Sequence, residues 1–89
     1  MPQVKIPPPY RGPTGGLASI AVAGATVREC ILAAADAHPG FGELILDADG
    51  RLHRFVTLFV NGDELARDEL DSAVAPGDEL EILAAIAGG

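Results

Sequence analysis

The chain has 89 residues and a formal net charge of −7, from 13 acidic and 6 basic side chains. A surface of this sign repels phosphate backbones, so we expect no nucleic-acid partner. No apolar stretch approaches the roughly 20 residues that span a bilayer, and the N-terminal residues lack the basic-then-apolar order of a signal peptide. We therefore expect one small cytoplasmic domain with no membrane partner.

Two short strands joined by a turn-rich loop are predicted at the start of the chain. Residues 4–6 form the first strand, which the prolines at 7–9 must end because proline has no backbone N–H. Residues 17–22 alternate in the manner of a second strand. The intervening "PTGG", residues 13–16, lacks the lysine and the following helix of a phosphate loop, so we interpret it as a flexible turn.

The main helix is predicted to begin after Thr26 and to end at the "HPG" of residues 38–40. Thr26 and Glu29 have the spacing of a capping box, in which each side chain hydrogen-bonds the other residue's backbone N–H. The apolar face repeats at helical spacing and consists of Val27, Cys30, Ile31, Ala34, Ala35 and His38.

The second half of the chain predicts three more strands and several turns. We expect an irregular or 3₁₀ turn at residues 43–45, a turn at 47–50, and a strand at 54–60 rich in β-branched and aromatic residues. Asn61 and Gly62 predict a hairpin turn into a short strand at 64–66, since both tolerate positive φ. A brief helical turn at 70–74 and a last strand at 79–83 complete the chain.

This order of elements predicts an α+β domain over residues 1–84, with a mixed sheet covered by the helix on one face. The first and last strands are expected to lie side by side. Residues 85–89 are expected to form a flexible tail, because Gly88 and Gly89 have no Cβ and lose much backbone entropy when fixed.

Candidate catalytic and metal-binding residues are few. Cys30 and His38 lie on the apolar helix face and are interpreted as packed residues, and His53 has no acid or nucleophile at a motif spacing. The acidic groups are interpreted as solvated turn residues rather than a cation site; they are Asp47 with Asp49, and Asp78 with Glu79 and Glu81. Without a nucleophile and base pair, a metal cluster or a cofactor loop, we expect no enzyme and no bound metal.

Alternation along the third strand predicts an unusual outer face. If Val56, Leu58 and Val60 face the helix, then Phe55, Thr57 and Phe59 face the other way. By the same rule, Leu80 and Ile82 point inward, and Glu79, Glu81 and Leu83 point outward. Phe59 and Leu83 would then form an exposed apolar patch rimmed by glutamates, suited to a protein partner. The alternative is that the chain's own loops cover it.

Several short segments resemble those of the ubiquitin-like β-grasp sulfur carrier proteins of the ThiS/MoaD family, and the resemblance covers nearly the whole chain. "KIP", "PTGG", "LHRFV", "VNG" and the closing "AGG" are most similar to the CysO-type carriers. The resemblance implies a β-grasp fold of about five strands with one main helix and a Gly-Gly tail.

The resemblance also implies a chemistry for the tail. The carboxylate of Gly89 would be adenylated by an ATP-dependent activating enzyme and converted to a thiocarboxylate that carries sulfur, while Ala87 and Gly88 thread a narrow channel. The open face around Phe55, Thr57, Phe59 and Leu83 would be the docking surface. Arg11 and Arg54 are interpreted as solvated surface residues.

The implied partners are a ubiquitin-activating-like adenylyltransferase and a sulfur-acceptor enzyme. In the CysO branch the acceptor is a PLP-dependent cysteine synthase, and a zinc metallopeptidase releases the cysteine. In other branches it is a thiazole synthase, molybdopterin synthase or an enzyme of secondary metabolism. ATP, PLP and zinc would belong to these partners, and this chain would bind no cofactor.

Two alternatives stay open at the level of sequence. A ubiquitin-like modifier would use the same activated Gly89 to form an amide with a lysine of a target protein. A plain interaction module would need no chemistry at Gly88 and Gly89.

Overall fold

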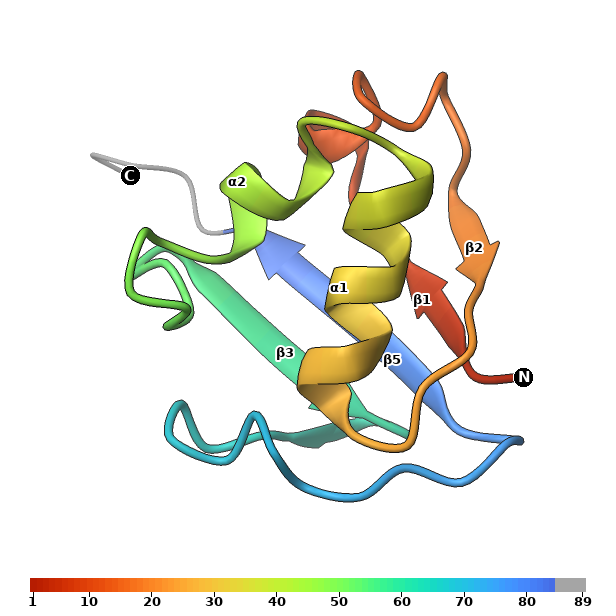
Figure 1. The fold of residues 1–89 in the computed structure, drawn as a ribbon, viewed down its shortest axis with the longest axis vertical. Helices are drawn as coiled ribbons and strands as arrows, with labels where there is room; N and C mark the ends of the chain where they lie inside the picture. The colour runs from red at the N-terminus through yellow and green to blue at the C-terminus, as the bar shows by residue number, and fades with distance from the viewer. Residues whose placement is uncertain (85–89) are drawn as a thin grey trace.

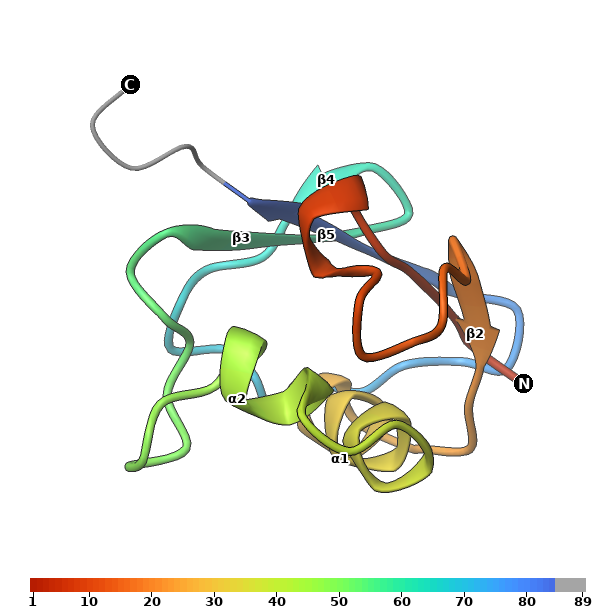
Figure 2. The same ribbon diagram turned by 90° about the horizontal axis from the view of Figure 1, so that it is seen from above.

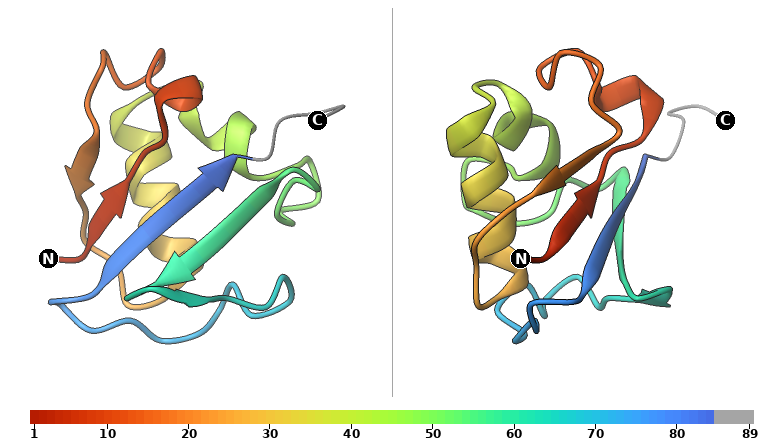
Figure 3. Two further views of the ribbon diagram at one scale, coloured as in Figure 1. Left: turned by 180° about the vertical axis from the view of Figure 1, so that it is seen from behind. Right: turned by 90° about the vertical axis from the view of Figure 1, so that its right-hand side faces the viewer.

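The first and last strands of the chain lie side by side at the centre of a five-stranded sheet with the order β2-β1-β5-β3-β4 (Figures 1 and 3). The computed structural model describes residues 1–84. β1 and β5 run parallel, with Val4 opposite Leu80, and every other pairing in the sheet is antiparallel. The α+β class, the mixed sheet and the adjacency of the terminal strands are therefore confirmed.

The strands are β1 (Gln3–Lys5), β2 (Ser19–Ala21), β3 (Val56–Val60), β4 (Asp63–Glu64) and β5 (Glu79–Ala84). The helices are the 3₁₀ helix η1 (Pro8–Tyr10), α1 (Val27–Ala37) and α2 (Phe41–Ile45). Both α-helices lie on the same side of the sheet, as the view in Figure 2 shows. None of the helices in residues 1–84 is long and apolar enough to cross a membrane.

The start of α1 follows the predicted capping pattern with one difference. The Thr26 hydroxyl accepts a hydrogen bond from the Glu29 N–H at 3.2 Å, as expected. The Glu29 carboxylate accepts from the N–H of Ala25 at 2.9 Å rather than from that of Thr26. Two donors at the helix start are still satisfied, so α1 begins where the sequence predicts.

The core lies between α1 and the inner face of the sheet. Its side chains come from alternate positions of the strands and from one face of each α-helix. The most fully buried are Val4, Val27, Cys30, Ile31, Phe41, Ile45, Val56, Leu58 and Leu80. α2 packs tightly on α1 at Gly42, where an added Cβ would lie 2.8 Å from the Ala35 Cβ.

The hairpin between β3 and β4 has the predicted turn, with φ of 52° at Asn61 and 88° at Gly62. A two-residue turn of this kind pairs the flanking residues directly, so β4 starts at Asp63, opposite Val60. The predicted short strand at 64–66 therefore starts one residue too late and ends two residues too late.

Segment 70–74 was predicted as a helical turn, which is wrong. The carbonyl of Leu70 accepts from the N–H of Arg28 at 2.7 Å, and that of Ser72 accepts from the N–H of Val27 at 3.1 Å. The first N–H groups of a helix have no partner within it, and here this neighbouring segment supplies their acceptors. The carbonyls of Leu70 and Ser72 therefore accept hydrogen bonds from α1 instead of from a helix formed by their own segment.

Other boundaries also differ from prediction. The first two strands are Gln3–Lys5 and Ser19–Ala21 rather than 4–6 and 17–22, and the last strand includes Ala84. Residues 43–45 belong to a short α-helix, α2, rather than to an irregular or 3₁₀ turn. β3 begins at Val56 and not at Arg54, and Val56 pairs with Ala84, the last residue that the structure describes. Arg54 and Phe55 thus lie in the turn that precedes the strand.

We expect Leu58→Ala to lower the free energy of unfolding by about 2–5 kcal/mol, because it leaves a cavity at the centre of the sheet. Leu58 is 1 % exposed, whereas its neighbour Thr57 faces outward and is only partly buried. Urea unfolding of Leu58→Ala beside the control Thr57→Ala measures the difference. Equal losses for both variants would contradict the assigned strand faces.

Candidate functional site

The sheet face opposite α1, which is turned toward the viewer in Figure 3 (left), carries three residues of the predicted docking surface: Thr57, Phe59 and Leu83. In β5, Leu80 and Ile82 are buried, whereas Glu79, Glu81 and Leu83 are exposed. In β3, Val56 and Leu58 are buried, and Thr57 and Phe59 are partly buried on the outer side. The predicted strand faces are confirmed.

An apolar patch, which we define as Thr57, Phe59 and Leu83, lies where β5 approaches its end. Leu83 is 53 % exposed and pairs with Thr57 across the strands. Phe59 is the diagonal neighbour of Leu83, a relation in which side chains lie roughly 7–8 Å apart or closer. Phe59 is partly buried because it stands between Glu81 of β5 and Glu64 of β4.

Phe55 lies beside this patch but not in β3, which corrects its predicted position. It is 44 % exposed in the turn before the strand, and the Arg54 guanidinium lies 5.2 Å from the centre of its ring. The next residue, Val56, pairs with Ala84. Phe55 therefore lies near the point at which the described chain ends.

A groove of about 450 Å³ borders Leu83 on its other side. The walls come from β1, β2, β5 and the proline segment, and the lining residues are Lys5, Ile6, Pro7, Pro8, Arg11, Ala18, Ser19, Glu81, Ile82 and Leu83. It combines apolar side chains with two cations, Lys5 and Arg11, and one carboxylate. Arg11, which we had interpreted as a solvated residue, also donates from Nε to the Ile6 carbonyl at 3.0 Å.

Carboxylates surround the apolar patch. Glu64 and Glu81 flank Phe59 in the sheet, and Glu79 lies further along β5. Lys5 pairs with Glu79 at 3.4 Å, with both side chains about half exposed. Exposed ion pairs stabilise little, so this rim adds little to the stability of the domain.

The residues considered for catalysis have structural roles. Burial, and secondarily the charge of Glu29, raises the pKa of the Cys30 thiol, so little of the reactive thiolate forms. His53 Nε2 lies 2.9 Å from the Glu43 carbonyl and joins its loop to α2. His38 is the C-cap of α1. Within residues 1–84, no group of three or more His, Cys, Asp or Glu side chains could hold a metal ion.

Two of the acidic turn residues hold their turns together. Asp47 accepts from the N–H groups of Arg51 and Asp49, and these bonds, that of Arg51 first, lower its pKa. Asp78 accepts from the N–H of Ala75 at 2.8 Å and from Asn61 Nδ2 at 2.9 Å, and both bonds, that of Ala75 first, lower its pKa. They are turn residues, as predicted.

The "PTGG" loop is more ordered than its glycines suggested. Thr14 is buried, and its hydroxyl lies 3.2 Å from the Arg11 carbonyl and 3.1 Å from the Leu17 carbonyl. The sequence analysis missed this anchor. A threonine directly before two glycines is the only signal for it, and such a pair is common in turns.

The tail residues Ala87, Gly88 and Gly89 lie outside the described residues. The apolar patch and Phe55 are thus the parts of the predicted site that the structure places. The groove, which the sequence analysis did not predict, adjoins the patch at Leu83.

Comparison with protein families and curated proteins gives a consistent result. Residues 9–89 match the ThiS family. The chain is 37 % identical to the sulfur carrier protein CysO of Mycobacterium tuberculosis over 89 residues, which cover 97 % of this chain and 96 % of the relative. It is 44 % identical over 48 residues to a protein of Archaeoglobus fulgidus described as a sulfur carrier, covering 53 % and 54 % of the two chains.

Solved structures agree with this result. A chain of the Amycolatopsis orientalis BexX/CysO complex superposes with a TM-score of 0.90 at 37 % identity, covering 100 % of both chains. CysO of Mycobacterium tuberculosis superposes with a TM-score of 0.88 at 34 % identity, covering 97 % of this chain and 100 % of the other. SAMP1 of Haloferax volcanii superposes with a TM-score of 0.83 at 27 % identity, covering 99 % of this chain and 98 % of the other. The fold is the ubiquitin-like β-grasp.

We expect acid to destabilise the domain as Asp47 and Asp78 take up protons. A carboxyl whose pKa is lowered on folding stabilises the folded state above its unfolded pKa of about 3.9, and this contribution disappears as the pH falls through the lowered value. Melting temperatures measured between neutral pH and pH ~2.5 should therefore fall below pH ~4. Asp78→Asn should melt lower at neutral pH and lose less on acidification, and a loss equal to the parent's would contradict the role of Asp78.

Proposed function

The chain belongs to the ThiS family and is a sulfur carrier protein, and we propose that it holds the sulfur as a thiocarboxylate at the carboxyl group of Gly89. The observation that carries the proposal is the full-length similarity to CysO together with a family match that extends through Gly88 and Gly89. In this role the chain is a substrate of other enzymes and not an enzyme itself.

The proposed chemistry needs only the terminal carboxylate from this chain. A carboxylate is a poor electrophile, so an activating enzyme would join its oxygen to the α-phosphorus of ATP and release pyrophosphate. A sulfur nucleophile would then attack the carbonyl carbon of Gly89, and AMP would leave with the carboxylate oxygen. Two glycines at the end allow the chain to enter a narrow channel without a Cβ.

We propose the apolar patch, with Phe55, as the surface that docks on the activating and acceptor enzymes. Its support is geometric, because Leu83 is exposed within the same strand that leads into the tail. A partner bound there needs to reach only the few residues from 85 to 89. A related chain forms part of a BexX/CysO complex, so a carrier of this type has been observed with a partner protein.

The acceptor is proposed to be a PLP-dependent cysteine synthase, with a zinc metallopeptidase that releases the product, by similarity to the CysO carriers. A thiazole synthase or another sulfur-using synthase would need the same thiocarboxylate. PLP and zinc would in each case be bound by the partner.

Conjugation to lysines is the second candidate function. The similarity to SAMP1, described as a small archaeal modifier protein, over nearly the whole chain favours it. An activated Gly89 would then be attacked by a lysine amine instead of by sulfur. The lower identity, 27 % against 37 %, makes this the weaker candidate.

We expect the intact mass of the protein to rise by the difference between sulfur and oxygen after incubation with ATP, an activating enzyme and a sulfide source. A variant lacking Gly89 should show no gain, and its unchanged cooperative melting would establish that the domain is folded. Absence of any gain in the parent would contradict the proposal. Branched peptides with Gly89 on lysine side chains would favour the modifier instead.

We expect Leu83→Ala to raise the KM of the activating enzyme for the carrier roughly tenfold, since an interface leucine of this kind contributes about 1.4 kcal/mol. Leu32→Ala is the matched control, because Leu32 is 51 % exposed on α1, away from the patch. Both variants should melt close to the parent. An equal change of KM for both would contradict docking at the apolar patch.

A further inference from the structure

A second cleft, of about 440 Å³, lies between the start of α1, the loop that precedes β3 and the segment that follows β4. Its lining residues are Arg28, Arg51, Leu52, Arg67, Asp68 and Leu70. Three of the chain's six basic residues therefore meet at one cleft of a protein whose net charge is −7. We call it the arginine cleft.

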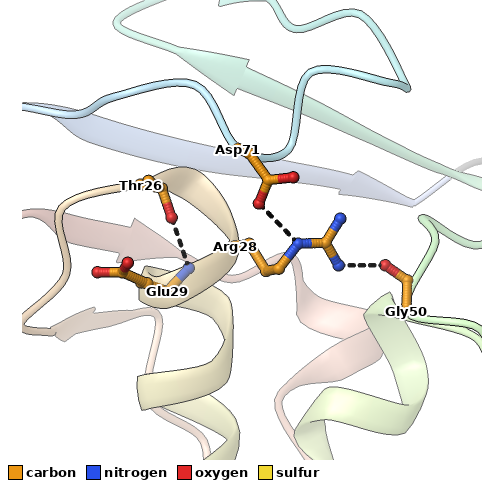
Figure 4. Close-up of polar contacts among 5 residues, drawn as sticks. All are labelled: Thr26, Arg28, Glu29, Gly50 and Asp71. Atoms are coloured by element: carbon orange, nitrogen blue, oxygen red, sulfur yellow. Dashed lines mark hydrogen bonds and ion pairs between the residues drawn. The ribbon is translucent and has the colours of Figure 1, made fainter.

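Arg28 is fixed in the wall of this cleft by two contacts, which Figure 4 shows. Its Nε donates to Asp71 Oδ1 at 2.9 Å, and its Nη1 donates to the Gly50 carbonyl at 2.5 Å. The second terminal nitrogen points away from both contacts. The side chain is 33 % exposed, so this edge of the guanidinium can still meet a ligand.

Arg67 is fixed by backbone carbonyls. Its Nη1 donates to Val56 at 2.8 Å, and its Nη2 donates to Leu52 at 2.9 Å and to His53. Carbonyl groups carry no net charge, so these bonds hold the guanidinium in place without neutralising it. A guanidinium has five N–H groups, so two of those of Arg67 remain for another acceptor.

Arg51 differs from the other two because its backbone, and not its side chain, is held. Its N–H donates to Asp47 Oδ1 at 3.0 Å, and its carbonyl accepts from the Asp47 N–H at 2.8 Å. Within residues 1–84, no hydrogen bond or ion pair engages its guanidinium. It can therefore close over a group that Arg28 and Arg67 already hold.

Acidic side chains border the arginine cleft. Asp68 in the lining, Asp71, which pairs with Arg28, and Asp47, whose carboxylate interacts with the charge of Arg51, offset the charges of the three arginines. Guanidinium groups bind phosphate through paired, charge-assisted hydrogen bonds. Leu52 and Leu70 line the same cleft and offer apolar contact to an organic group attached to the phosphate.

We propose that the arginine cleft is a binding site for a phosphate group, either as the free ion or as the monoester of a small molecule. The site is independent of the sulfur chemistry proposed for Gly89. The guanidinium groups of Arg28 and Arg67 are already held in place, which lowers the entropy that binding costs. The exposed Arg51 side chain would complete the site once the ligand is bound.

Titration of the full chain with inorganic phosphate at constant ionic strength, followed by amide NMR shifts, tests the proposal. Saturable shifts are expected around Arg28, Arg51 and Arg67. Arg51→Gln should weaken binding about fivefold, the effect of losing one surface charge contact of ~1 kcal/mol. Arg54→Gln removes the same charge three residues away, outside the cleft lining, and should leave the affinity unchanged.

Phenyl phosphate provides the second arm of the experiment. Tighter binding than inorganic phosphate would support a monoester as the ligand, and equal binding would support the free ion. Shifts that do not saturate, or an equal weakening in Arg51→Gln and Arg54→Gln, would show general attraction to charge only and would overturn the proposal.

Discussion

The parallel pairing of β1 with β5 is the interaction on which the rest of the structure depends. It buries Val4 against Leu80 at the centre of the sheet and ties the start of the chain to its end. The pairing covers only Glu79 to Glu81, because Pro7 to Pro9 follow β1 and cannot extend it. β3 alone pairs with the rest of β5, up to Ala84. The end of β5 is thus held on one side and borders the groove on the other.

This arrangement explains how so small a domain can serve as a carrier. The proposed reactive group is a terminal carboxylate, so the domain needs no cleft of its own for chemistry. It would need a rigid strand that leads to the tail and a surface on which partner proteins dock. β5 combines both, because its inward residues Leu80 and Ile82 are buried in the core while Leu83 stays exposed beside them.

Local rules predicted those features that depend on neighbouring residues in the sequence. The capping threonine, the turn at Asn61 and Gly62 and the alternation in β3 and β5 each gave the correct element. The errors depend on distant partners instead. Segment 70–74 takes its shape from hydrogen bonds to the N–H groups of α1. The partial burial of Phe59 between Glu64 and Glu81 likewise requires the order of the strands, which alternation alone does not give.

The apolar patch and the arginine cleft differ in the charged side chains that surround them. Glu64, Glu79 and Glu81 lie on the outer face of the sheet with Lys5, whereas three arginines meet at the arginine cleft. The carboxylates around the apolar patch would favour a partner with a basic contact surface and would orient it toward the sheet face. That orientation presents Leu83 and the end of β5 first. The lining of the arginine cleft shares no residue with the apolar patch, so a phosphate group bound there would leave Thr57, Phe59 and Leu83 uncovered.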